Sequence, residues 1–204
     1  SYSVNKEDMW ISRIPVPVEI NASAHADDDF SKFGSIAELT NWNIYSPVWA
    51  PVSLEGAWLK LQDKDPFDYA KVERKIPASK ELKVSFDLLA EQNDKGRLQI
   101  DFLDGNSIAC SRLELTPDGI FRMKGGSRFA NMMNYEAGKT YHVEAVLSTA
   151  DRNIQVYVDG KRVGLRMFYA PVATIERIVF RTGEMRTFPT VDTPADQTYD
   201  LPDA

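Results

Sequence analysis

Apolar and polar residues alternate one by one through much of the second half of the chain. In segments 141–147 and 154–158 every second residue is apolar. A period of two places successive side chains on opposite faces of an extended strand. The polar residues 150–153 separate the two segments, and Asp159-Gly160 follows the second, where glycine accepts a positive φ without steric cost. Because no helical pattern intervenes, this stretch predicts three consecutive antiparallel strands.

The same pattern predicts further short strands at 84–88, 98–102, 109–115, 120–123 and 175–180. Turn signals rich in Asp, Gly and Asn separate them. A short helix is predicted over 30–39. The alternation also predicts which side chains face the core; they are Val84, Phe86, Leu88, Leu98, Ile100, Phe102, Leu113, Leu115, Phe121, Met123, Val143, Ala145, Ile154, Val156 and Val158. We therefore predict an all-β fold, an antiparallel two-sheet β-sandwich.

Composition shifts divide the chain into three parts. Residues 1–24 are predicted to form a strand and a linker stiffened by Pro15 and Pro17. Residues 25–186 are predicted to be the sandwich. The stretch 187–204, rich in Pro, Asp and Thr, is predicted to be an irregular tail.

Residues 139–164 resemble the laminin-G, pentraxin and legume-lectin superfamily. The matching elements are a strand of the form Tyr-His-Val-x-Ala-Val, a turn, and then Ile-x-Val-Tyr-Val-Asp-Gly-Lys-x-Val. The resemblance implies a concanavalin A-like jelly roll. That architecture hosts lectins, glycan-binding modules, glycosidases, lyases and adhesion domains, so the resemblance indicates the fold more sharply than the function.

A second resemblance lies at the beginning of the chain. Residues 6–17, Lys-Glu-Asp-Met-Trp-Ile-Ser-Arg-Ile-Pro-Val-Pro, resemble the last strand and exit of a sialidase-like propeller of the Asp-box repeat kind. This implies the C-terminal part of a larger bacterial glycan-active protein, a glycoside hydrolase with a neighbouring domain. It also implies a secreted, periplasmic or cell-surface location.

Charge and cysteine content narrow the possible functions. The net charge of −6 argues against nucleic-acid binding, which needs a basic surface. No apolar run approaches the roughly 18 residues that span a bilayer, so membrane insertion is not expected. Cys110 is the only cysteine, which excludes an internal disulfide. Its place on an alternating strand predicts a small buried hydrophobe rather than a reactive thiol.

Two groups of residues are candidates for carbohydrate binding. The first is aromatic and comprises Trp42, Tyr45 and Trp49, near Trp58. Flat rings can stack on the C–H face of a sugar, but the same residues could instead fill a core. The second is the polar face that alternation predicts for the strands; its members are Asp87, Gln99, Asp101, Arg112, Glu114, Arg122 and Lys124.

Within that polar face, Asp101, Arg112 and Arg122 are the candidate contacts for a glycan. Arginines can pair with the carboxylates of uronic or sialic acids, which would make the partner an acidic glycan. The alternative is a set of cross-strand ion pairs on a solvated face.

Asp63, Asp65 and Asp68 place three carboxylates within six residues. Calcium prefers several oxygen ligands from a flexible loop, so these residues are candidates for a structural calcium site. An acidic turn between strands is the alternative. No other cofactor is indicated.

The sequence lacks the catalytic pattern of jelly-roll glycosidases. Such enzymes place two carboxylates about 5 Å apart, in the form Glu-x-Asp-x-x-Glu on one strand, and no such run occurs. His25 and His142 do not form a zinc pattern. A non-catalytic carbohydrate-binding or accessory module is the first interpretation. A part of a hydrolase or lyase active site, and a structural module that braces a propeller, remain the alternatives.

Overall fold

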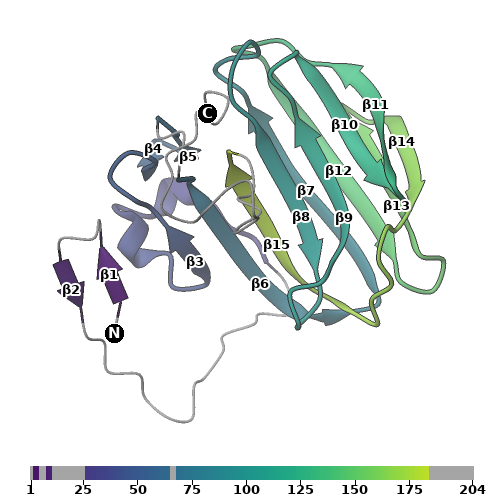
Figure 1. Cartoon of the computed structure of the whole chain (residues 1–204), viewed down its shortest axis with the longest axis horizontal. Helices are drawn as coiled ribbons and strands as arrows, with labels where there is room; N and C mark the ends of the chain where they lie inside the picture. Colours follow the sequence, from purple (N-terminus) through teal and green to yellow (C-terminus); the bar gives the residue numbers. More distant parts are fainter. Residues whose placement is uncertain (1, 5–7, 11–25, 65–67, 184–204) are drawn as a thin grey trace, which may run out of the picture.

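A computed structural model describes residues 2–4, 8–10, 26–64 and 68–183. Two antiparallel sheets face one another and form a β-sandwich (Figure 1). The predicted all-β jelly-roll fold is confirmed.

The larger sheet has seven strands in the order β11-β10-β9-β8-β15-β6-β3. Their bounds are Arg128–Asn134, Ile120–Gly125, Ala109–Leu115, Leu98–Leu103, Ile175–Thr182, Lys71–Ser79 and Trp42–Tyr45. The smaller sheet has four strands in the order β14-β13-β12-β7, which are Lys161–Met167, Asn153–Val158, Thr140–Ser148 and Glu81–Leu89. Every pairing in both sheets is antiparallel.

The main core fills the space between the two sheets. Ile100, Phe102, Leu113 and Val143 are fully buried there, as strand alternation requires for one face of each sheet. All fifteen side chains that the sequence predicts to face inward belong to this cluster or pack against it. Burial of this apolar surface is the main driving force that holds the sheets together.

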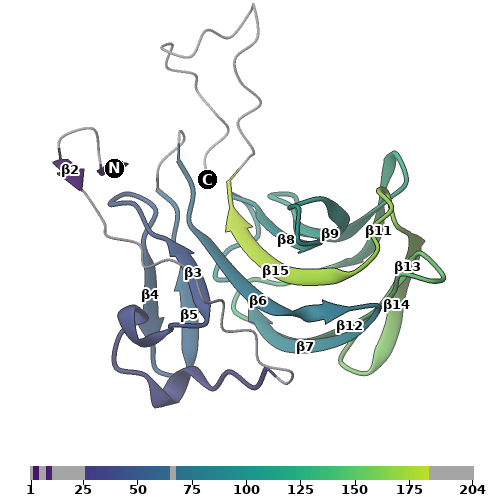
Figure 2. The same cartoon turned by 90° about the horizontal axis from the view of Figure 1, so that it is seen from below.

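The larger sheet extends beyond the smaller one, and a second cluster covers the overhang. A hairpin of β4, Val52–Glu55, and β5, Trp58–Leu61, packs beside β6 and β3 (Figure 2). The buried members of this cluster are Ala50, Val52, Ala70 and Val72. The sandwich therefore has a main core and a smaller satellite core at one end of the seven-stranded sheet.

The predicted helix over 30–39 is wrong. Two short 3-10 turns stand there, η1 at Phe30–Lys32 and η2 at Ile36–Glu38. Asp29 caps the first turn by accepting from the backbone N–H of Ser31, but Phe33 then adopts an extended conformation. Neither turn contains a buried residue, so no packed apolar face sustains a longer helix.

At the beginning of the chain, β1, Tyr2–Val4, pairs with β2, Asp8–Trp10, as a separate two-stranded sheet. The linker predicted in residues 11–24 and the tail predicted in 187–204 lie outside the described residues.

Candidate functional site

The face of the seven-stranded sheet that points away from the smaller sheet is concave (Figure 2). Charged side chains line this face. Alternation places Gln99 and Asp101 of β8, Arg112 and Glu114 of β9, and Arg122 of β10 on this face. In the register, Asp101 lies opposite Arg112 and Gln99 lies opposite Glu114. Asp101, Arg112 and Arg122, predicted to share a face, are thus brought together on neighbouring strands.

Ion pairs connect these strands across the concave face. The Nε and Nη2 atoms of Arg112 donate to the two carboxylate oxygens of Asp101 at 2.6 and 2.8 Å. Burial lowers the pKa of Arg112, but the hydrogen bonds and charge of Asp101 outweigh it and raise the pKa overall. The same two nitrogens of Arg122 donate to Oε1 of Glu114, which is 1% exposed. The forks of both arginines are therefore occupied by carboxylates of the chain itself.

Aromatic rings flank the charged centre, each with a cation above it. The guanidinium of Arg122 lies 4.2 Å from the ring centre of Phe129, and the ammonium of Lys124 lies 4.5 Å from that of Tyr169. Burial raises the pKa of Tyr169 to about 12. Phe129 remains partly exposed at the β11 edge. These rings add apolar surface to an otherwise polar face, a combination that suits a sugar.

Arg181 of β15 occupies the middle of the face, between Gln99 of β8 and Lys71 of β6. Its guanidinium stacks over the ring of Tyr69 at 4.4 Å, and Tyr69 in turn lies 5.2 Å from the ring of Tyr45. Burial lowers the pKa of Arg181, and the nearby charge of Arg112 adds to this effect. The sequence interpretation stopped at residue 180 and missed Arg181; continuing the alternation from Arg177 and Val179 would have placed it on this face.

The three aromatic candidates from the sequence are not brought to one place. Tyr45 lies at the β3 end of the concave face, 43% exposed, and its hydroxyl donates to Asp68. Trp42 lies on the opposite face of β3, where it packs between Phe30 and Phe180. Trp49 lies in the loop before β4 and is 66% exposed.

Asp87 is a correction to the predicted polar face. It lies on β7 of the smaller sheet, opposite His142, and accepts from the Nδ1 atom of that histidine at 2.8 Å. Alternation fixes the face of one sheet on which a residue lies, but it does not tell which of two sheets a strand joins.

Two of the three candidate calcium ligands are described, and both make local hydrogen bonds. Asp63 accepts from the hydroxyl of Thr182 at 2.7 Å, and Asp68 accepts from Tyr45 and from the N–H of Tyr69. Asp65 lies outside the described residues. Within the described part of the chain no three acidic, histidine or cysteine side chains cluster as metal ligands do.

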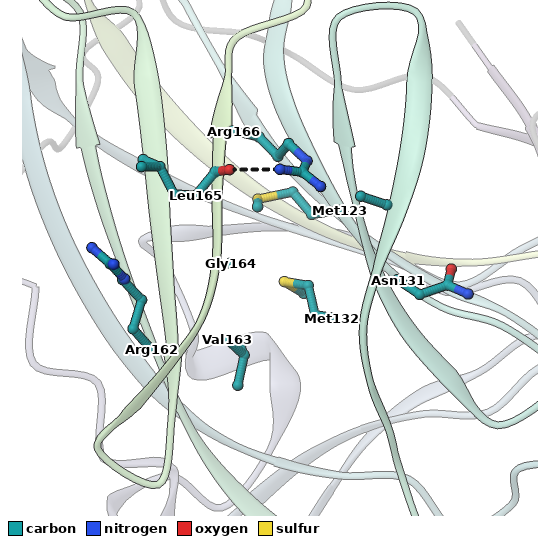
Figure 3. Close-up of a pocket in the computed structure, with 9 residues that line it drawn as sticks. Met123, Asn131, Met132, Arg162, Val163, Gly164, Leu165 and Arg166 are labelled. Carbon is teal, nitrogen blue, oxygen red and sulfur yellow. Dashed lines mark hydrogen bonds between the residues drawn. The ribbon is translucent and has the colours of Figure 1, made fainter.

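A cleft of about 380 Å³ separates the edge strands β11 and β14 of the two sheets (Figure 3). Met123 and Met132 point into it toward Gly164, and Arg162 and Arg166 stand at its rim. A Cβ atom on Gly164 would lie 2.8 Å from the ends of both methionine side chains. β14 can therefore approach β10 and β11 this closely only because residue 164 has no side chain.

Cys110 is fully buried, as predicted. Burial raises the pKa of its thiol to about 12, so the nucleophilic thiolate is not populated near neutral pH.

The profile of the family described as "Sialidase-like, CBM domain" matches residues 42–197, which includes every strand of both large sheets. The chain belongs to this family. No curated protein matches this sialidase-like CBM domain.

A near-identical stretch occurs within a longer protein of known structure. The domain is 96% identical to part of a chain named "Sialidase", with a TM-score of 0.88. The match covers 99% of this chain and 19% of that chain. The domain thus spans about a fifth of the length of that protein.

One more distant structure with a TM-score above 0.5 shares the fold alone. The Crh5 transglycosylase superposes with a TM-score of 0.63 at 10% identity, over 79% of this chain and 70% of its own. Sheep galectin-11 matches 54% of this chain and 88% of its own at 18% identity, with a TM-score of 0.43.

None of the helices in the described residues has the length and hydropathy of a membrane span.

Proposed function

We propose that this domain is a non-catalytic carbohydrate-binding module and that its glycan lies on the concave face of the seven-stranded sheet. The observation that carries the proposal is the family match, which spans every strand of that face. Charged groups on β8, β9 and β10 offer hydrogen bonds to sugar hydroxyls, and the rings of Tyr45 and Phe129 remain partly exposed for stacking.

The paired carboxylates favour binding over catalysis. Asp101 is held by Arg112, and Glu114 by Arg122, so both acids of the central strands already have cationic partners. A glycosidase instead needs one carboxyl group free to donate a proton and another free to attack or activate water. We therefore propose that catalysis in the longer protein, a sialidase by its near-identical relative, occurs elsewhere, and that this domain holds substrate nearby. A secreted, periplasmic or cell-surface location fits that role.

A glycan array probed with the isolated chain tests the proposal, followed by calorimetric titration of the best ligand. Tyr45→Ala should weaken binding, because it removes an exposed ring from the concave face. Tyr157→Ala is the matched control, since Tyr157 lies on β13 of the smaller sheet and its hydroxyl also has a side-chain partner, Gln155. Equal losses in the two variants, or no binding to any glycan, would contradict the proposal.

A bracing role is the second candidate, favoured by an exposed apolar corner. Val48 and Trp49 of the loop before β4 are 58% and 66% exposed. We propose that this corner contacts a neighbouring domain of the longer protein. Proteolysis of the longer protein tests this: Trp49→Ser should increase cleavage between the domains if the corner is a contact, and leave it unchanged if it is not.

A further inference from the structure

Arg181 differs from Arg112 and Arg122 of the concave face in what its fork contacts. Arg112 and Arg122 use the edge formed by Nε and Nη2 to bind Asp101 and Glu114. On the inner face of the same sheet, Arg74 uses this edge to bind Asp28 at 2.7 and 3.3 Å. In Arg181 the Nε and Nη2 atoms are buried and have no hydrogen-bond partner in the structure. A guanidinium fork matches a carboxylate bidentately, so the forks of Arg74, Arg112 and Arg122 each hold a carboxylate, whereas that of Arg181 holds none.

The two described acids whose charges act on Arg181 are already engaged elsewhere. Asp101 binds Arg112, and Asp63 accepts from the hydroxyl of Thr182 at 2.7 Å. Among the described residues, no carboxylate forms an ion pair with Arg181. Buried donors without an acceptor destabilise the folded state, and a bound anion would remove that destabilisation.

A free acceptor lies on the next strand. Gln99 is opposite Arg181 in the register of β8 and β15, and its side chain is 4% exposed. Its Nε2 atom donates to Glu114 at 3.3 Å, whereas its Oε1 atom is buried without a partner. Two donors of Arg181 and one acceptor of Gln99 therefore lie on adjacent strands without hydrogen-bond partners. A sugar acid carries the complement of both, a carboxylate and hydroxyl groups.

We propose that Arg181 is the anchor for the carboxylate of an acidic glycan, with Gln99 accepting from a hydroxyl of the same sugar. This rests on the proposed function and names its ligand class and its central contact. Tyr69 stacks on one face of the guanidinium at 4.4 Å and fixes the plane in which the fork can receive an anion. Because Nε and Nη2 are buried, the side chains over them must move to admit the carboxylate.

The chemistry fits both sialic and uronic acids, and paired probes distinguish them. Calorimetric titrations would use 3′-sialyllactose with its methyl ester, and a galacturonic acid trisaccharide with its methyl ester. One acid should bind the unmodified chain about tenfold or more tightly than its ester, as expected for a charge-assisted bidentate pair. The acid that shows this difference identifies the source of the carboxylate.

Arg181→Lys keeps the charge and removes the fork. It should reduce the preference for the acid several-fold, because a lysine ammonium attracts a carboxylate but cannot pair with it bidentately. Arg177→Lys is the matched control on the same strand; its two terminal nitrogens donate to Ser107 and Gly105 in the loop that precedes β9. That variant should keep the preference. In NMR spectra, the Nε–H signal that Arg181→Lys removes should shift on addition of the acid and not of the ester.

The outcomes separate the two proposals. Equal binding of acid and ester, or a preference that is undiminished in Arg181→Lys, overturns the role of Arg181 while glycan binding stands. The role of Arg181 is also overturned if the acid binds but the Nε–H signal of Arg181 does not shift. If no acid and no ester binds, this inference fails, and the glycan array then decides separately whether the domain binds any carbohydrate.

Discussion

Glu114 shows how one residue can determine the stability of the concave face. Its side chain is 1% exposed and accepts hydrogen bonds from Arg122 and Gln99, with Arg97 at 3.8 Å. Removing one partner of a buried ion pair costs more than the pair contributes, because the remaining charge stays buried. Arg122 is therefore structural even if a glycan also contacts it.

Arg122→Ala should lower the free energy of unfolding by about 2 kcal/mol, since Arg122 is partly exposed and its loss leaves Glu114 with weaker partners. Urea denaturation measures the change. Glu114→Gln should recover part of the loss in the double variant, because a neutral amide does not need the arginine. An unchanged midpoint in Arg122→Ala would show that the pair contributes nothing.

Because the thiol of Cys110 is buried, we expect the free energy of unfolding to fall at alkaline pH. Its pKa is raised from 9.0 to about 12 in the folded chain, so the thiol stays protonated there while the unfolded chain ionises. The stabilisation is fully present below pH 9 and is lost as the pH rises toward 12; by about pH 10.5 the loss is about 2 kcal/mol. Urea denaturation between pH 8 and 10.5 measures it.

Cys110→Ala is the control for this pH dependence. The variant is destabilised at every pH by the lost side chain, but its stability should fall less steeply above pH 9. Tyr169, whose pKa also rises to about 12, still contributes to the remaining slope. Parallel stability curves for the two proteins would refute the assignment to Cys110.

The acidic residues Asp63, Asp65 and Asp68 remain a predicted calcium site. If they bind calcium, a chelator should lower the melting temperature, because a ligand that binds only the folded state stabilises it. Differential scanning calorimetry with and without chelator tests this, and Asp68→Asn should remove any difference. Coincident melting curves for the unmodified chain would eliminate calcium.

At the scale of strands, alternation alone located most of the sandwich. The strand β9 begins and ends where the sequence predicts, and β8 differs by one residue. The strand β6 escaped prediction because Arg74 faces inward among Val72 and Ile76, which breaks the apolar series. Its charge is compensated by Asp28, a partner distant in sequence, and no local pattern reveals such a pair.

The strand β11 was missed for a different reason. Its pairing with β10 contains a register shift between Phe121 and Arg122, and the consecutive residues Met132 and Met133 both pack against the main core, so the period of two is lost.

The sequence predicted the candidate site only in part. Alternation placed Arg112 and Arg122 on one face of the sheet. It could not predict that carboxylates occupy their forks or that the fork of Arg181 is unpaired, because both depend on which strands are neighbours in space.

The approach of β14 to β10 depends on Gly125. A Cβ atom there would lie 2.8 Å from Cβ of Arg166, an atom close to the backbone that cannot swing away. Gly125→Ala should therefore push the strands apart and cost about 1–3 kcal/mol in the free energy of unfolding. Gly164→Ala should cost less, because it meets only the flexible ends of Met123 and Met132. Urea denaturation of both variants tests this order, and the reverse order would contradict the packing argument.

At the scale of the whole molecule, the N-terminal hairpin is separate from the sandwich ladder. In the described strands, β1 pairs with β2 and neither pairs with the two large sheets. Removing residues 1–18 should therefore leave the melting temperature of the sandwich within about 2 °C, since every core residue for which the structure describes burial lies beyond that segment. Calorimetry of the truncated chain measures this. Cooperative unfolding on truncation would show that the segment belongs to the sandwich and would exclude a role in a neighbouring propeller.

Phe180 packs against both the main core and the satellite core, and it is the residue before Arg181 on β15. Phe180 on one side of this strand thus joins the two cores, and Arg181 on the other side faces the concave surface. Whatever holds β15 in place stabilises both cores together, so the domain should lose its structure as one cooperative unit. A sugar bound at Arg181 would then stabilise both cores at once, and it should slow the hydrogen exchange of backbone amides at both ends of the large sheet.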